Sequence, residues 1–127
     1  SEHAPCLIRS AQNNQMTSVN IKKETMMAGL SCGEPSFLGW EILSKGVDDF
    51  ITISDASIPE SMRLLAKNKP SIEAGESSVA GLEGLMQAMN NKDVAEKIKL
   101  NSNSIVLLFG TEGATDPEIY DAIINAT

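Results

Sequence analysis

Apolar residues recur at the spacing of an amphipathic helix in several parts of the chain. The clearest helix is predicted for residues 76–89, where Val79, Leu82, Leu85 and Met89 share one face. Its glycines lower the intrinsic helix stability but allow close packing against a neighbouring element. Further helices are predicted for residues 4–12, 25–30, 37–45, 58–67 and 92–99.

Capping residues indicate where several of these helices begin or end. Thr25 is a plausible N-cap for the small-residue helix that follows it. Gly46 is suited to close the helix predicted over residues 37–45. Asp116 and Pro117 predict the start of a final helix, with Asp116 as its N-cap and Pro117 at its first position.

Two other stretches have the pattern of strands. Residues 49–54 alternate apolar and polar side chains, residues 104–109 form a short apolar run, and residues 19–21 give a weaker third signal. Helices that alternate with strands predict an α/β fold, here a partial three-layer αβα domain with a short parallel sheet. Because two or three strands make a poor independent sheet, we expect residues 1–127 to be a fragment of a larger domain. The opening at Ser1, without an initiator methionine, favours the same interpretation.

The charge balance argues against nucleic acid as a partner. Lys and Arg number 10 against 17 Asp and Glu, which gives a net charge of -7. Affinity for a phosphate backbone depends on clustered cations, and the chain has no such cluster. Its apolar runs are also too short to span a membrane. We therefore expect a protein without nucleic-acid or membrane partners.

The two cysteines, Cys6 and Cys32, show neither the spacing of metal ligands nor a disulfide framework. Free thiols in a reducing cytoplasm are the expectation. His3 is the only histidine, so a zinc site built from His and Cys is not predicted. A hydrolytic set of nucleophile, histidine and acid is not predicted either, because His3 lies near a chain end.

The loop over residues 110–116 is the first candidate site. It follows the apolar run and precedes the final helix, and such loops carry the ligand sites of α/β proteins. Thr111 offers a hydroxyl, and the backbone amides of the loop could face an anion. An ordinary connection between two elements explains the same residues, and the loop lacks the Gly-Lys-Ser/Thr of a P-loop.

Residues 74–78, at the start of the clearest predicted helix, are the second candidate. They place Glu76 beside Ser77 and Ser78, a composition that suits contact with an anion or a cofactor. Simple helix capping by one of the two serines accounts for the same pattern. Residue chemistry alone therefore leaves both candidates open.

Several motifs of the chain together resemble diaminopropionate ammonia-lyase, a pyridoxal-phosphate (PLP) enzyme of the tryptophan synthase β-like, fold type II superfamily. The most specific is Ala-Gly-Leu-Ser-Cys-Gly-Glu-Pro at residues 28–35. The resemblance covers nearly the whole chain. The other matching segments are residues 5–11, 40–43, 61–66, 74–77, 107–113 and 115–118.

The resemblance implies a homodimeric enzyme that converts 2,3-diaminopropionate, a small amino acid, to pyruvate and ammonia. In that family the Schiff-base lysine, the phosphate-binding loop and the catalytic carboxylates lie upstream of the region matched here. None of Lys22, Lys23 and Lys45 lies in the lysine motif of the family. We therefore expect residues 1–127 to be the C-terminal part of the large PLP-binding domain, to hold no catalytic residue and to be inactive alone.

The resemblance also implies which residues approach the cofactor. Thr111, Gly110 and Gly113 lie on the loop that reaches the pyridine nitrogen in related enzymes, and Thr111 is the expected partner of that nitrogen. Glu76 is a weaker candidate near the ring. The family usually reads Phe-Ser-Thr-Glu-Gly-Asp-Thr-Asp in this loop, so Gly110 stands for the Ser and Ala114 for the Asp.

Two other interpretations stay open at this point. A relative of the threonine and serine dehydratases would share the loosely conserved loop but act on a different leaving group. A non-catalytic α/β binding domain would share the fold pattern without the cofactor. A lysine-bearing region in a longer protein would separate the enzyme from the binding domain.

Overall fold

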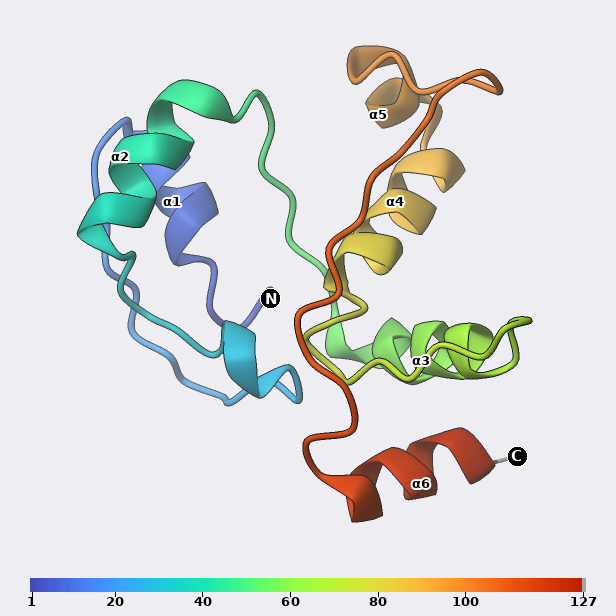
Figure 1. Ribbon diagram of the computed structural model, residues 1–127. Coiled ribbons are helices and arrows are strands. Elements are labelled where there is room, and N and C mark those ends of the chain that lie inside the picture. The colour runs from blue at the N-terminus through green and yellow to red at the C-terminus, as the bar shows by residue number, and fades with distance from the viewer. Residues whose placement is uncertain (127) are drawn as a thin grey trace. The chain divides into compact units, whose positions relative to one another are not determined.

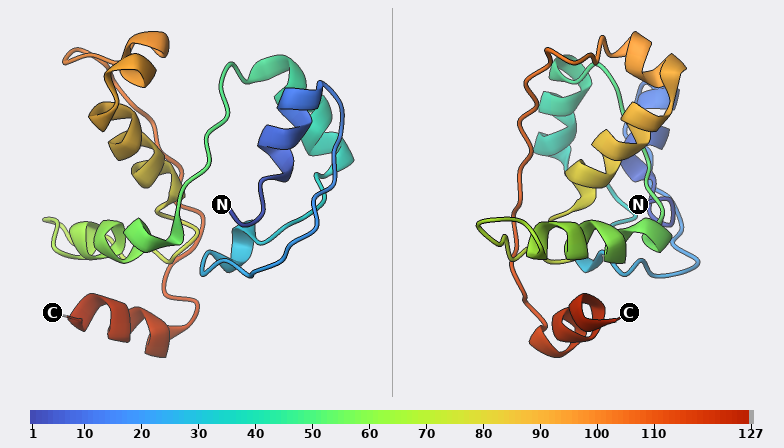
Figure 2. Two further views of the ribbon diagram at one scale, coloured as in Figure 1. Left: turned by 180° about the vertical axis from the view of Figure 1, so that it is seen from behind. Right: turned by 90° about the vertical axis from the view of Figure 1, so that its right-hand side faces the viewer.

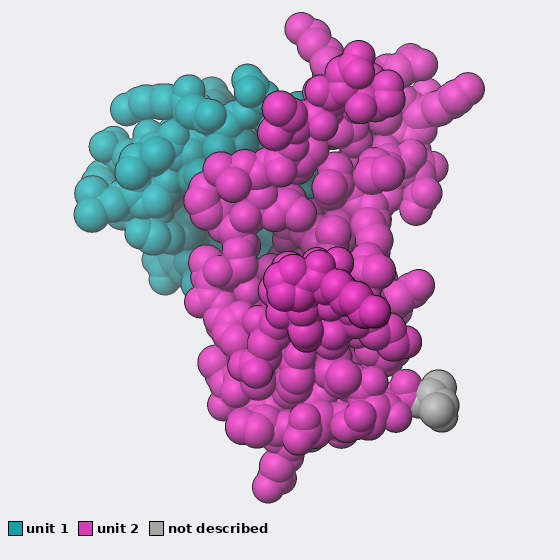
Figure 3. Space-filling model, turned by 45° about the vertical axis from the view of Figure 1, so that its right-hand side comes forward, with its two compact units in different colours: residues 1–55 teal, residues 56–127 magenta. Residues whose placement is uncertain are grey.

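The computed structural model describes residues 1–126 of the chain, and their regular secondary structure is entirely helical. The chain divides into two compact units, Ser1–Asp55 and Ala56–Thr127, which Figure 3 distinguishes by colour. Each unit has its own buried residues and is described by itself. No helix in the described part is both long and apolar enough to cross a membrane.

Unit 1 contains α1 (Cys6–Asn13), the short 3-10 turn η1 (Ala28–Leu30) and α2 (Phe37–Gly46). α1 is closed by the following residue, Asn14, whose φ of 51° is the left-handed conformation common after helices. α2 begins behind Ser36, whose side chain accepts a hydrogen bond from the Gly39 amide. The helices predicted over residues 4–12 and 37–45 are therefore confirmed, with ends that move by one or two residues.

The helix predicted to begin at Thr25 is wrong, since only the single turn η1 forms there. The Thr25 side chain does not cap that turn; its hydroxyl donates to the Asp55 carboxylate instead. The Met26 amide donates to the same carboxylate at 2.9 Å. Thr25 is buried, so this distant partner satisfies a polar group that would otherwise be costly inside the unit.

Unit 2 is built on α3 (Ile58–Ala66), which contacts both α4 (Ala80–Asn90) and α6 (Pro117–Asn125). Figures 1 and 2 show α6 running along one side of α3 and α4 rising from the other. The short α5 (Lys92–Lys97) packs on α4. The core holds fully or almost fully buried apolar side chains from α3, α4 and the segment before it: Ile58, Met62, Ala74, Val79 and Ala88.

The predicted helices of unit 2 are confirmed, with one late start. Residues 76–79 form a turn, and α4 begins only at Ala80. The Ser78 amide already donates to the Gly75 carbonyl in that turn. At α6 the predicted capping is confirmed: the Asp116 side chain accepts from the Ile119 amide at 3.1 Å.

The predicted fold class, a three-layer αβα domain with a short parallel sheet, is wrong for residues 1–126, which contain no strand. Residues 49–54 and 104–109 run as extended chain in Figure 1, as their patterns suggest, but neither forms a strand within residues 1–126. A strand is defined by its ladder of hydrogen bonds to a neighbour, so local pattern alone cannot make one. Residues 19–21 supply only one such bond, from the Val19 amide to the Gly33 carbonyl at 2.8 Å.

The segment over residues 104–109 is also exposed rather than buried. Ile105 is 100% exposed, and Leu107 and Phe109 are 75% and 76% exposed. The alternate residues, Val106 and Leu108, are 44% and 39% exposed because they face α4, and the segment runs beside that helix in Figure 1. The alternation of an extended chain is thus present, with a helix on one side and solvent on the other.

Candidate functional site

The loop after the extended segment lies directly on the segment before α4, and Glu112 makes most of the contacts between them. Its carbonyl oxygen accepts from the Gly75 amide at 3.2 Å. Its carboxylate Oε1 accepts from the Ser77 amide at 2.8 Å, and its own amide donates to Ser78 Oγ at 3.3 Å. The backbone and the side chain of this one residue therefore bind three of the four residues 75–78.

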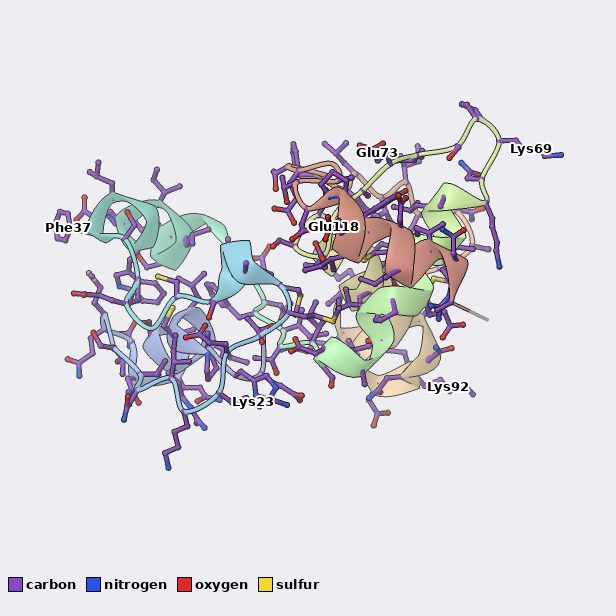
Figure 4. All side chains as sticks on the ribbon, turned by 90° about the horizontal axis from the view of Figure 1, so that it is seen from below. Lys23, Phe37, Lys69, Glu73, Lys92 and Glu118 are labelled. Carbon is purple, nitrogen blue, oxygen red and sulfur yellow. The ribbon has the colours of Figure 1, made fainter. Side chains whose placement is uncertain are left out.

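A second carboxylate holds the loop from its other end. Glu73 Oε1 accepts from the Ala114 amide at 3.1 Å. Around this second anchor point the loop turns tightly, since the Thr115 amide donates to the Gly113 carbonyl at 2.9 Å. Figure 4 shows Glu73 on the chain segment that leads into this contact. Residues 110–114 and 73–78 are called the clamped loop and the clamp segment below.

The glycines of these two segments permit very close backbone packing. A Cβ at Gly75 would lie 2.5 Å from the Gly113 carbonyl oxygen and 2.9 Å from Glu112 Oε1. A Cβ at Gly113 would lie 3.0 Å from Glu73 Oε1, and one at Gly110 would lie 3.0 Å from Ser78 Oγ. The space that these glycines leave is filled by protein atoms, so the loop is a packed edge and not an open cradle.

Thr111 carries a hydroxyl group on the clamped loop that is open to a ligand. It is exposed, and within residues 1–126 its hydroxyl has no hydrogen-bond partner. Glu76 is half-buried, and its carboxylate has no partner within the same range. The structure thus places Thr111, Gly110 and Gly113 on one loop, and it joins that loop to the segment that carries Glu76.

Glu112 and Glu73, which hold this arrangement together, were not predicted from the sequence. Glu112 lay in the loop that an ordinary connection between two elements explains, and Glu73 lay just outside the second candidate segment. The one signal in the sequence is that both are carboxylates within two residues of a glycine, and carboxylates accept strong hydrogen bonds from backbone amides. Their partners are 35 and 41 positions away, however, and no local pattern identifies them.

Unit 1 contains a separate polar cluster around Asp55. Its carboxylate accepts from Thr25 and Met26, and His3 Nε2 lies 3.9 Å from Asp55 Oδ2. Burial alone raises the pKa of Asp55, but these hydrogen bonds and the charges of His3 and Lys23 outweigh it, so the pKa is lowered. In the described part of the chain no group of three or more His, Cys, Asp or Glu side chains could hold a metal ion.

Every lysine of the chain is exposed. Figure 4 shows Lys69 and Lys92 extending outward from unit 2. A lysine that carries a cofactor needs a site that shields it and orients it, and the surroundings of these side chains provide neither. The described residues therefore offer a hydroxyl and a carboxylate at a packed loop, but no enclosed amine.

The chain is similar to known enzymes over almost all of its length. It is 37% identical over 130 residues to diaminopropionate ammonia-lyase of Escherichia coli K12, covering 97% of this chain. It is 26% identical over 124 residues to a probable D-serine dehydratase of Acinetobacter baylyi, covering 91% of this chain. A solved structure of the Escherichia coli ammonia-lyase, in complex with an aminoacrylate-PLP azomethine reaction intermediate, superposes with a TM-score of 0.82 at 35% identity and covers 96% of this chain.

The chain spans about a third of the length of these relatives, 32% of the ammonia-lyase and 28% of the dehydratase. The superposed structure is likewise covered over 32% of its chain. The family model that describes a pyridoxal-phosphate dependent enzyme matches residues 1–110, which is most of the sequence. The chain therefore belongs to the family of pyridoxal-phosphate dependent enzymes.

Proposed function

We propose that this chain is the C-terminal part of the PLP-binding domain of an ammonia-lyase that cleaves 2,3-diaminopropionate to pyruvate and ammonia. The similarity to diaminopropionate ammonia-lyase along 97% of the chain supports the proposal. The observation that carries it is the free Thr111 hydroxyl, because that group stands on a loop fixed by Glu112 and Glu73.

The described residues fit one edge of PLP. An exposed hydroxyl without a protein partner suits the pyridine nitrogen, since it can donate or accept one hydrogen bond and carries no charge. The clamped loop offers no equivalent site for the phosphate, because its glycine positions are closed by protein atoms. The lysines are exposed, so the Schiff-base lysine belongs to another region of the enzyme in this proposal.

When bound, PLP acts as the electron sink for bond cleavage at the α-carbon of an amino acid. Thr111 would hold the ring at its nitrogen and thereby orient it. Gly110 and Gly113 would contribute through their close packing against Ser78 and Glu73, which holds the loop backbone at the ring edge. Glu76 would act from the clamp segment, as a weaker contact near the ring.

The whole enzyme in this proposal is a homodimer that acts on a small amino acid. The isolated residues 1–127 would be inactive, since they hold no catalytic residue. A cytoplasmic location belongs to the same proposal, and its support is that Cys6 and Cys32 are both free thiols.

Two competing functions make different predictions. A threonine or serine dehydratase would release pyruvate or a related keto acid from a hydroxy amino acid and not from 2,3-diaminopropionate. Its support here is the weaker similarity to a probable D-serine dehydratase. A non-catalytic binding domain would take up no PLP in any context, and the family membership of the chain speaks against it.

The test uses the longer enzyme that contains this sequence. Its visible absorbance would report bound PLP, and assays of pyruvate and ammonia with 2,3-diaminopropionate, serine and threonine would identify the substrate. Thr111→Val removes the hydroxyl at nearly constant volume, and Thr115→Val is the matched control on the same loop. We expect Thr111→Val to shift the cofactor absorbance and Thr115→Val to leave it unchanged; an unshifted Thr111→Val spectrum contradicts the role of Thr111.

A further inference from the structure

Glu112 is bound to the clamp segment more extensively than any other residue of the clamped loop. Its carbonyl, amide and carboxylate each take part in one hydrogen bond, with Gly75, Ser78 and Ser77 respectively. Bonds at both its amide and its carbonyl restrict rotation of the backbone on each side. Glu112 is half-buried, so solvent competes only partly for these contacts.

This restraint acts directly on Thr111, the preceding residue. The Thr111–Glu112 peptide bond is a rigid unit, so fixing the Glu112 amide on Ser78 Oγ fixes the carbonyl side of Thr111 as well. The direction of the Thr111 hydroxyl then depends mainly on one side-chain rotamer. The fixed backbone therefore limits the positions that the hydroxyl can reach.

We infer that Glu112 is the positioning residue for Thr111: its carboxylate, held on the Ser77 amide, sets where the Thr111 hydroxyl meets the cofactor ring. The inference rests on the proposed function, in which Thr111 contacts the ring nitrogen. A side-chain acceptor oxygen at this reach is needed because the backbone groups of Glu112 are already used, and only its Oε1 accepts from the Ser77 amide, at 2.8 Å.

Gly75 is also required for this positioning of Thr111 by Glu112. Its missing side chain lets the Gly113 carbonyl and Glu112 Oε1 come within 2.5 Å and 2.9 Å of the position that a Cβ would occupy. The loop can sit deep enough for the carboxylate to reach the Ser77 amide only because that space is free. The positioning role therefore belongs to a matched pair, a glycine on one segment and a glutamate on the other.

The experiment compares three substitutions at Glu112 in the PLP-loaded enzyme. Glu112→Gln keeps an oxygen that can accept from the Ser77 amide, Glu112→Ala removes it, and Glu112→Asp keeps the charge on a side chain one methylene shorter. Glu118→Ala is the control, since Glu118 is exposed, lies six positions further on and has no hydrogen bond to its side chain within residues 1–126. The readouts are the cofactor absorbance across pH and kcat/KM.

We expect Glu112→Ala and Glu112→Asp to shift the cofactor absorbance in the same direction as Thr111→Val. A loss of kcat/KM of up to about 100-fold is expected, the size that a small misplacement of a reacting group can cause. Glu112→Gln should stay close to the parent enzyme, and Glu118→Ala should not differ from it. If Glu112→Ala does not fold, Glu112→Asp and Glu112→Gln still form a complete comparison.

A double substitution separates positioning from mere stabilisation. If Glu112 acts through Thr111, Thr111→Val combined with Glu112→Asp shifts the absorbance no further than Thr111→Val alone. Additive shifts, or an unchanged spectrum in Glu112→Asp beside a shifted one in Thr111→Val, overturn the inference and leave the proposed function intact. An unchanged spectrum in Thr111→Val itself overturns the inference together with the ring-nitrogen role of Thr111. The proposed ammonia-lyase function fails separately, if the parent enzyme releases no pyruvate and ammonia from 2,3-diaminopropionate.

Discussion

Residues 105–109 and 110–114 follow one another in the chain, but they differ in the contacts that hold them in place. The first five are apolar, and none of them has a backbone hydrogen bond to another described residue. In the next five, two residues are tied to the clamp segment by hydrogen bonds over 34 to 41 positions. The apolar segment places the side chains of Val106 and Leu108 against α4.

The difference shows what each kind of residue can do without a neighbouring strand. An apolar extended segment leaves its backbone groups unpaired, because it relies on another strand for them. A polar loop can meet the same requirement with side chains, as Glu112 and Glu73 do. The candidate site is therefore organised within unit 2, while the segment beside it is not covered there.

The largest effect is expected for Gly75→Ala, which should separate the clamped loop from the clamp segment. The added Cβ would lie 2.5 Å from the Gly113 carbonyl oxygen, so the clamped loop must move away. We expect the free energy of unfolding to fall by about 3 kcal/mol, the upper range for overpacking. Urea unfolding followed by circular dichroism measures it.

The matched control is Gly46→Ala at the end of α2, where a Cβ meets no atom within 4 Å. Alanine is the better helix former, so stability should rise by about 0.5 to 1 kcal/mol. Equal effects of the two substitutions would mean that the close approach at Gly75 does not hold the loop.

Asp55 in unit 1 is a second carboxylate that accepts hydrogen bonds from distant residues, and its contribution to stability should depend on pH. Because its pKa is lowered on folding, the stability it contributes is present above the ordinary pKa of an aspartate and is lost as pH falls through the lowered value. We expect Asp55→Asn to flatten the pH dependence of thermal unfolding in this acid range. An identical pH profile in the variant would show that Thr25 and Met26 gain nothing from the charge.

The smallest effect on stability is expected for Leu107→Thr in the uncovered segment. Leu107 is 75% exposed, so its replacement should change the free energy of unfolding by no more than about 0.5 kcal/mol. Self-association should decrease, since contiguous exposed apolar surface promotes it. Sedimentation velocity would detect the change, and Leu64→Thr on α3, at a side chain that is 52% exposed, is the control.

Local pattern predicted the helices well because their signals lie within the helix itself. Asp116 and Pro117 marked the start of α6, and the apolar spacing over residues 76–89 identified α4. The predicted strands failed because a strand needs a partner that residues 1–126 do not supply. Thr25 was misjudged for a related reason, since its partner Asp55 is 30 positions away.

The candidate site was predicted in part. The position of the loop after an apolar run, together with the family resemblance, identified Thr111, Gly110 and Gly113, and their role at the cofactor stays a prediction. Glu112 could not be identified in this way, because its significance lies in a contact with Ser77 across 35 positions. Residue type and spacing indicate which groups are available, while long-range hydrogen bonds decide how they are held.

The C-terminal end of the clamped loop is fixed on both sides, because the N-cap of α6 follows it almost directly. Ala114 is bound to Glu73, and Asp116 is already engaged with the Ile119 amide. Only Thr115 lies between these two fixed points, and its amide is used as well. An inserted residue here would break one of these hydrogen bonds. The exposed turn over residues 101–104 could accommodate an insertion. We therefore expect active members of the family to keep the number of residues in this loop as well as the residues themselves.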